Sequence, residues 1–206
     1  MPVCERRLRT SRRYFSHKLC ENIMAYLIWT LFIFPSFVMA IVGRILAPVL
    51  PFFVQEDGYL PAWLWWFQTP DNPCDGDRGH WKRWPGTDPW SMYKRRVAWF
   101  LRNVAYGFDE TVCGIKTRPT DRLEIIGNED ASDKNGISGL CKYYLYRDGK
   151  LIGWQVYYIK HYKVWRITAC IRINMGWKLW NPDCINKQWT CYAHPWKTLR
   201  WHKEGK

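Results

Sequence analysis

The sequence predicts an α+β protein in which an N-terminal transmembrane helix precedes a small antiparallel β-sheet domain with one amphipathic helix. Three observations predict this class: a long uncharged run near the N-terminus, a well-capped amphipathic helical pattern, and alternating strands joined by turn residues. With 206 residues and 48% hydrophobic content, the chain suits one domain plus an appendage and is neither disordered nor collagen-like. Its 15 Trp and net charge of +13 are unusual.

The apolar run near the N-terminus predicts the first element. No charged side chain occurs from Asn22 to Gly43, and beyond one arginine the apolar residues continue to Val54. About 20 such residues cross a hydrocarbon core as a helix, so residues 22–54 are expected to form a transmembrane or membrane-associated segment. Two alternatives stay open, namely a secretory signal peptide ending near Ala40 and a helix buried in a protein core.

Positive charge precedes this segment and predicts its orientation. Residues 1–21 hold six basic side chains, whereas the stretch directly after Gly43 holds a single one, Arg44. The six are Arg6, Arg7, Arg9, Arg12, Arg13 and Lys18. The positive-inside rule makes this N-terminus cytoplasmic and exports the chain that follows one crossing. Pro48 and Pro51 disfavour a second crossing immediately afterwards.

Residues 55–86 are expected to form an aromatic interfacial segment and a loop. The predicted membrane-interface side chains are Trp63, Trp65, Trp66 and Phe67, because amphipathic rings are enriched where lipid headgroups meet water. A buried aromatic cluster in a soluble domain is the alternative.

The loop after these aromatic residues carries weak candidates for a metal site. Asp71, Asp75, Asp77 and His80 could ligate a hard cation and serve a metal-dependent hydrolase. Their spacing does not match an EF-hand, and aspartate beside proline and glycine is mostly turn chemistry. Nucleophile-elbow, phosphate-loop, dinucleotide and zinc-protease motifs are missing from the sequence. We therefore expect a protein that is not an enzyme and needs no cofactor.

The clearest helical pattern begins after the loop. Asp88 is a suitable N-cap with Pro89 at the first helical position, and Gly107 is a suitable stop. The apolar positions are Trp90, Tyr93, Val97, Phe100, Leu101 and Val104. The other face carries the basic residues Lys94, Arg95, Arg96 and Arg102. These residues are candidate contacts to an anionic surface, the alternative being a solvated face on a helix packed against a sheet.

Strand patterns fill most of the remaining chain. Cys141–Arg147 and Leu151–Lys160 flank Asp148-Gly149, a dipeptide favoured in type I′ hairpin turns. Leu123–Ile126 is a further candidate strand, and the polar segment between it and the hairpin is expected to be an exposed loop.

The last strand pattern, Val164–Asn174, alternates and so predicts one buried and one polar face. The isoleucines are assigned to the buried face, with Cys170 and Asn174 on the polar one. We expect an antiparallel meander covered on one side by the Asp88–Tyr106 helix, within an α+β domain over residues 87–206.

Tryptophan and basic residues are mixed in the C-terminal tail. The tryptophans are Trp177, Trp180, Trp189, Trp196 and Trp201. Lys197 and Arg200 in this tail join the candidate contacts to an anionic surface. Rings interleaved with cations also suit single-stranded nucleic acid, but a membrane surface is the simpler partner after an apolar helix.

Six of the eight cysteines follow the apolar run. An exported domain could join them in up to three disulfides of open connectivity, whereas a cytoplasmic domain would keep free thiols. Cys170, on the predicted polar face, is expected to be a disulfide or surface residue.

Two stretches resemble a family of uncharacterised proteins encoded by tailed bacteriophages. They are Leu60-Pro61-Ala62-Trp63-Leu64-Trp65-Trp66-Phe67-Gln68-Thr69-Pro70-Asp71-Asn72-Pro73, with its WFQTPD motif, and Trp99-Phe100-Leu101-Arg102-Asn103-Val104-Ala105-Tyr106-Gly107-Phe108. The similarity covers residues 45–180, with Val104 where proline is expected. It implies a viral origin and a bacterial host but no activity.

These observations together predict a phage-encoded single-pass protein of the host inner membrane. Its expected role is non-catalytic, either in modifying the host envelope or in binding a host or phage membrane protein. The sequence does not predict an oligomeric state.

Overall fold

The chain divides into two compact units. In the computed structural model the backbone is described for residues 3–70, 72–164, 167–179, 192–193 and 200–203, and side chains for 23–70, 72–163 and 169–179. The sheet unit comprises Met1–Leu31 with Ile115–Lys206, and the helical unit comprises Phe32–Gly114. Helix α1, Val3–Leu46, contributes to both. This division differs from the predicted boundaries after residues 21, 54 and 86, because residues 32–114 pack together.

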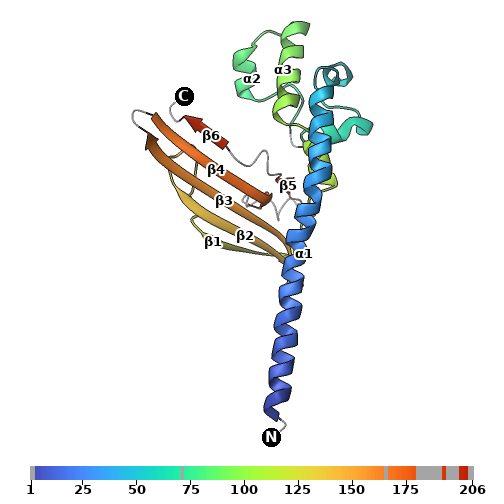
Figure 1. Ribbon diagram of the computed structural model, residues 1–206. Helices are drawn as coiled ribbons and strands as arrows, with labels where there is room; N and C mark the ends of the chain where they lie inside the picture. Colours follow the sequence, from blue (N-terminus) through green and yellow to red (C-terminus); the bar gives the residue numbers. More distant parts are fainter. Residues whose placement is uncertain (1–2, 71, 165–166, 180–191, 194–199, 204–206) are drawn as a thin grey trace. The chain divides into compact units, whose positions relative to one another are not determined.

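The sheet is antiparallel, as predicted. Its strands are β1 (Arg122–Gly127), β2 (Gly139–Arg147), β3 (Lys150–Val164), β4 (Ile167–Trp177), β5 (Tyr192–Ala193) and β6 (Arg200–Lys203). They lie in the order β1-β2-β3-β4-β5, with β6 also paired to β4 (Figure 1). The hairpin between β2 and β3 turns at Asp148 and Gly149, which both have positive φ, and the predicted α+β class is confirmed.

The predicted faces of β4 are wrong. Cys170 and Asn174 are buried although both were assigned to the polar face, while on the other face Ala169 is buried and Ile171 and Ile173 are only half-buried. A buried amide network explains the burial of Asn174, because Gln155 Nε2 donates to Asn174 Oδ1 at 2.6 Å. The Gln155 Oε1 atom accepts from the Leu179 backbone N–H at 2.7 Å. A satisfied network allows these polar groups to be buried.

A helix other than the predicted one packs on the sheet. Trp154 of β3 points to the face opposite Gln155, and its ring centroid lies 4.9 Å from that of Tyr26 and 5.1 Å from that of Trp29. Both belong to α1. The residues of the Asp88–Tyr106 helix, which was predicted to cover the sheet, belong to the helical unit.

The helical unit consists of short elements after the end of α1. They are η1 (Leu50–Phe53), η2 (Ala62–Phe67), α2 (Arg78–Arg83), α3 (Pro89–Arg102) and α4 (Tyr106–Thr111). Helix α3 begins as predicted, because Asp88 Oδ1 accepts from the Trp90 and Ser91 N–H groups. It ends at Arg102 rather than at Gly107, because Ala105 adopts a left-handed backbone with φ 52°.

Gly107 has a packing role in place of the predicted stop. It lies inside α4, where its N–H donates to the Gln68 carbonyl at 2.8 Å. A Cβ there would collide with the Trp65 carbonyl oxygen. Glycine therefore allows α4 to approach η2 closely. The core of the unit contains Ala47, Leu50, Leu60, Leu64, Cys74, Trp99 and Phe100.

Candidate functional site

The side chains of α1 that face the rest of the chain are small. In the helical unit the α1 residues Ser36 and Ala40 are fully buried, as is Ala47 directly after the end of the helix. Gly43 is buried with them, and a Cβ built on it would lie 2.8 Å from Val104 Cγ1. The spacing of three to four residues places Ser36, Ala40 and Gly43 on one helical face. We call this the inward face of α1; it permits close backbone packing.

The opposite side of α1 carries large apolar side chains that are exposed. Phe34 is 73% exposed and Ile45 is 70% exposed. The outward face of α1 in the helical unit consists of Phe34, Phe37, Val38, Ile41 and Ile45, all exposed. Within the described part of the chain, Ile23–Leu46 is the one helix long and apolar enough to cross a membrane.

Exposed aromatic residues continue beyond α1 in the helical unit. Trp63 is 71% exposed, and its ring lies edge-on to that of Phe53 at 5.5 Å between centroids. Trp66 is also exposed and lies edge-on to Phe108. Trp65 and Phe67 are half-buried, and Phe67 packs against the core. Of the four predicted interface residues, Trp63 and Trp66 are thus the exposed ones.

Arg95 is not a surface residue, contrary to the prediction. It is fully buried, and its Nη1 donates to the carbonyls of Trp84 and Gly86, both at 2.6 Å. Its guanidinium carbon lies 3.7 Å from the centroid of the Trp81 ring. The Arg95 guanidinium therefore stabilises the loop before α3 and is not positioned to bind an external anion.

The other predicted cations differ in their availability. Arg96 Nε donates to Asp75 Oδ1 at 2.7 Å. Arg102 is more than half exposed and pairs with Asp77. The Lys94 ammonium lies 5.6 Å from the centroid of the Trp90 ring. Lys197 lies outside the described residues, as does the side chain of Arg200.

Two of the predicted metal candidates, Asp75 and Asp77, form ion pairs with arginines of α3, and Asp77 also caps α2. Asp77 caps α2 by accepting from the Gly79 and His80 N–H groups, and the His80 Nδ1 lies 2.7 Å from its carboxylate. Hydrogen bonding from His80 and Arg102 holds the pKa of Asp77 well below its usual range. Asp71 lies outside the described residues, and among those described no three His, Cys, Asp or Glu side chains are grouped to hold a metal.

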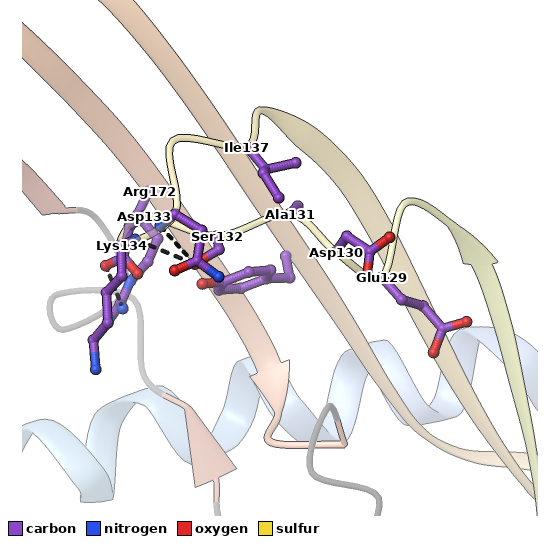
Figure 2. A pocket seen from close by; sticks show the side chains of 10 residues that line it. Glu129, Asp130, Ala131, Ser132, Asp133, Lys134, Ile137 and Arg172 are labelled. Atoms are coloured by element: carbon purple, nitrogen blue, oxygen red, sulfur yellow. Dashed lines mark hydrogen bonds and ion pairs between the residues drawn. The ribbon is translucent and has the colours of Figure 1, made fainter.

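The sheet unit contains a cavity of about 490 Å³ that sequence reasoning missed (Figure 2). The segment between β1 and β2 lies over β3 and β4 there, and Arg172 Nη1 donates to Asp133 Oδ2 at 2.9 Å. Tyr157 also lines the cavity, and burial raises its pKa. Figure 2 shows Glu129 and Asp130 apart from this ion pair. The lining contains both acidic and basic side chains and so favours no ligand class. In the sequence, the polar loop between the first two strands was the only indication of this cavity.

The described cysteines outside α1 are buried, and no disulfide joins them to one another. They are Cys74, Cys113, Cys141 and Cys170. The prediction that Cys170 is a disulfide or surface residue is wrong. Burial raises the pKa of Cys74 to about 12, so it is held as an unreactive thiol. The side chains of Cys4, Cys20, Cys184 and Cys191 lie outside the described residues.

Comparison with known proteins gives one match. Residues 21–201 match the model of a family of unknown function, DUF7338. Neither the curated proteins nor the solved structures contain a match to the chain. The match includes α1 from its apolar part onwards, the helical unit and most of the sheet. Because it covers well over half of the sequence, the chain belongs to the DUF7338 family.

Proposed function

We propose that this protein is a membrane-anchored interaction protein without catalytic activity. Helix α1 binds a lipid bilayer and holds the sheet unit at the membrane surface. The outward face of α1 carries this proposal, because large apolar side chains such as Phe34 and Ile45 are exposed along a helix whose inward face is packed. Nothing in the described chain offers a competing catalytic constellation.

The energetics of exposure support a lipid environment for this face. Removing a phenylalanine or isoleucine side chain from water stabilises by about 1.5–3 kcal/mol when burial is complete. Soluble monomers rarely expose contiguous apolar patches above a few hundred Å². Insertion of the outward face of α1 into lipid removes this cost, and the exposed rings of Trp63 and Trp66 suit the headgroup region.

The setting of this function is proposed from the sequence. The basic residues of 1–21 support a cytoplasmic N-terminus beside anionic lipid headgroups. The resemblance to tailed-phage proteins supports the inner membrane of an infected bacterium. A role in modifying the host envelope, or in binding a host or phage membrane protein, follows from that setting.

The two alternative functions have less support. A metal-dependent hydrolase needs free carboxylates, but Asp75 and Asp77 are paired with Arg96 and Arg102. Nucleic-acid binding depended on the Trp-rich tail, most of which lies outside the described residues.

Membrane fractionation tests the proposal. The full chain is expressed, and membranes are washed with high salt and then alkaline carbonate. We expect the chain to stay in the pellet until detergent is added, because its attachment is apolar rather than ionic. Recovery of the unmodified chain in the soluble fraction after the salt wash would contradict the proposal.

A matched pair of variants locates the attachment. The double variant Phe34→Glu/Ile45→Glu places charges on the outward face of α1 and is expected to lower the pelleted fraction at least tenfold. Ile126→Glu makes the same change at a 51% exposed position of β1 and should leave the pelleted fraction unchanged. Cooperative thermal unfolding of both variants in detergent confirms that they fold. Equal pelleting of the two would place the attachment elsewhere.

A further inference from the structure

We infer that α1 does not cross the bilayer but lies in the plane of one leaflet, with its outward face inserted and both ends of the chain on the same side. This inference rests on the proposed membrane anchoring and revises the single-pass topology that the sequence predicts. The partner surface is a lipid leaflet rich in anionic headgroups. Three independent features of the described chain support it.

The first feature is a buried hydrogen bond near the middle of the apolar segment. Ser36 Oγ donates to Asp109 Oδ1 at 2.7 Å, and both residues are buried. If Ile23–Leu46 crossed the bilayer, Ser36 would lie near its centre and would bring the Asp109 carboxyl group there. Ionisable groups at that depth are costly. Helix α4, Tyr106–Thr111, is also far too short to span.

In-plane placement removes this conflict. The inward face of α1 stays against the protein, so Asp109 remains on the protein side of the helix and away from lipid. The outward face meets the acyl chains along the length of α1 in the helical unit. Interfacial helices usually turn a charged face to water, whereas here the small residues of the inward face are covered by the chain itself.

The second feature is where the sheet contacts α1 within the sheet unit. Tyr26 and Trp29, in the first turns of the apolar segment, pack on Trp154 of β3. In a single crossing, every residue after Leu46, including Trp154, would lie on the far side of the bilayer. At 1.5 Å per residue, that side begins about 30 Å along the helix from Tyr26. The contacts with Trp154 therefore keep the sheet beside the N-terminal end of the segment.

The third feature is the state of the cysteines. Cys74, Cys141 and Cys170 are free and buried, as is usual for a reducing compartment. The basic side chains of residues 1–21 indicate that same cytoplasmic side. Their positive charge also complements anionic headgroups, which favours lipid over an apolar protein groove as the occupant of the outward face.

Protease protection of both chain ends tests the topology. The full chain carries a different epitope tag at each end, and right-side-out and inverted vesicles are prepared from the expressing cells. We expect protease to remove both tags from inverted vesicles and neither tag from right-side-out vesicles. Loss of one tag in each preparation would establish a crossing and overturn the inference, while membrane anchoring would survive. A chain that does not sediment with the vesicles would instead refute the proposed function.

Flotation with protein-free liposomes tests whether lipid, rather than another protein, covers the outward face of α1. The purified chain is diluted from detergent into vesicles containing phosphatidylglycerol, and it should float with them. Phe34→Glu/Ile45→Glu should lower the floated fraction at least tenfold, and Ile126→Glu should not change it. A chain that sediments with cell membranes but does not float would have a protein occupant on its outward face, which overturns the inference.

Discussion

The two faces of α1 in the helical unit are both mainly apolar, with Arg44 as the one charged residue in this part of the helix, yet they differ in the size of their side chains. Ser36, Ala40 and Gly43 face the chain, whereas Phe34 and Ile45 face away from it. Packing against protein needs close approach of backbones, and glycine provides it. Lipid chains adapt to large side chains without such matching. On this helix, side-chain size therefore distinguishes the face that contacts protein from the face proposed to contact lipid, whereas hydropathy does not.

The inward face should be the one intolerant of size. Gly43→Leu places side-chain atoms into Val104, whose Cγ1 lies 2.8 Å from an added Cβ. We expect a loss of about 3 kcal/mol in the free energy of unfolding, measured with urea in detergent. Ile45→Leu is the matched change on the outward face and should cost less than about 0.5 kcal/mol. Equal losses in the two variants would remove the distinction between the faces.

Acid should destabilise the sheet unit through an ion pair within that unit, between Arg147 and Asp121. Arg147 donates to both oxygens of Asp121 at 2.8 Å, and these bonds lower the pKa of the buried Asp121 carboxyl group. A lowered folded-state pKa stabilises above the unfolded value of about 3.9. The stabilisation from this pair should therefore be constant from pH 7 to 5 and decline below about pH 4.

Asp121→Asn isolates this acid dependence. The variant should lose about 2 kcal/mol at neutral pH, because Arg147 loses its charged partner. Its urea midpoint should then fall less on acidification than that of the unmodified chain. An unchanged acid dependence would show that other carboxyl groups determine it.

Removal of the polar contact on the inward face should have a smaller effect. Ser36→Ala deletes the hydrogen bond to the buried Asp109 carboxyl group. We expect a loss of about 1–2 kcal/mol in unfolding free energy. Thr30→Ala is a suitable control, because its exposed hydroxyl bonds only to the Tyr26 carbonyl one turn earlier. The hydrogen bond is not stabilising if the two variants unfold at the same urea concentration.

Truncation on the outward face should leave folding nearly untouched. Phe34→Ala removes a side chain that is 73% exposed, so the free energy of unfolding in detergent should change by less than about 0.5 kcal/mol. Liposome binding should nevertheless weaken severalfold, because less apolar area enters the lipid. A large loss of stability would mean that this face packs on protein.

The sequence predicted those elements that depend on local chemistry. Asp88 and Pro89 start α3, and Asp148-Gly149 closes the hairpin, because capping and positive φ are decided within a few residues. The end of α3 was missed, because the left-handed residue is Ala105 rather than a glycine, and Gly107 instead packs against the Trp65 carbonyl. No local pattern contains that contact.

The candidate site was predicted in outline and corrected in detail. The apolar character of α1 was evident, but which of its residues face the chain depends on partners such as Val104 and Asp109. Arg95 was expected at the surface because charge usually lies there, yet it is buried with its guanidinium against two carbonyls and the Trp81 ring. Partners distant in sequence decide such positions.

Residue-level labelling from within the bilayer is the most direct test of lipid contact along α1. The full chain is bound to liposomes that carry a photoactivatable probe in their acyl chains, and the adducts are mapped by mass spectrometry. We predict adducts on Phe34, Ile41 and Ile45 and none on Ser36 or Ala40. Labelling of both faces alike, or of neither face in a liposome-bound chain, would contradict the assignment of the outward face of α1 to lipid.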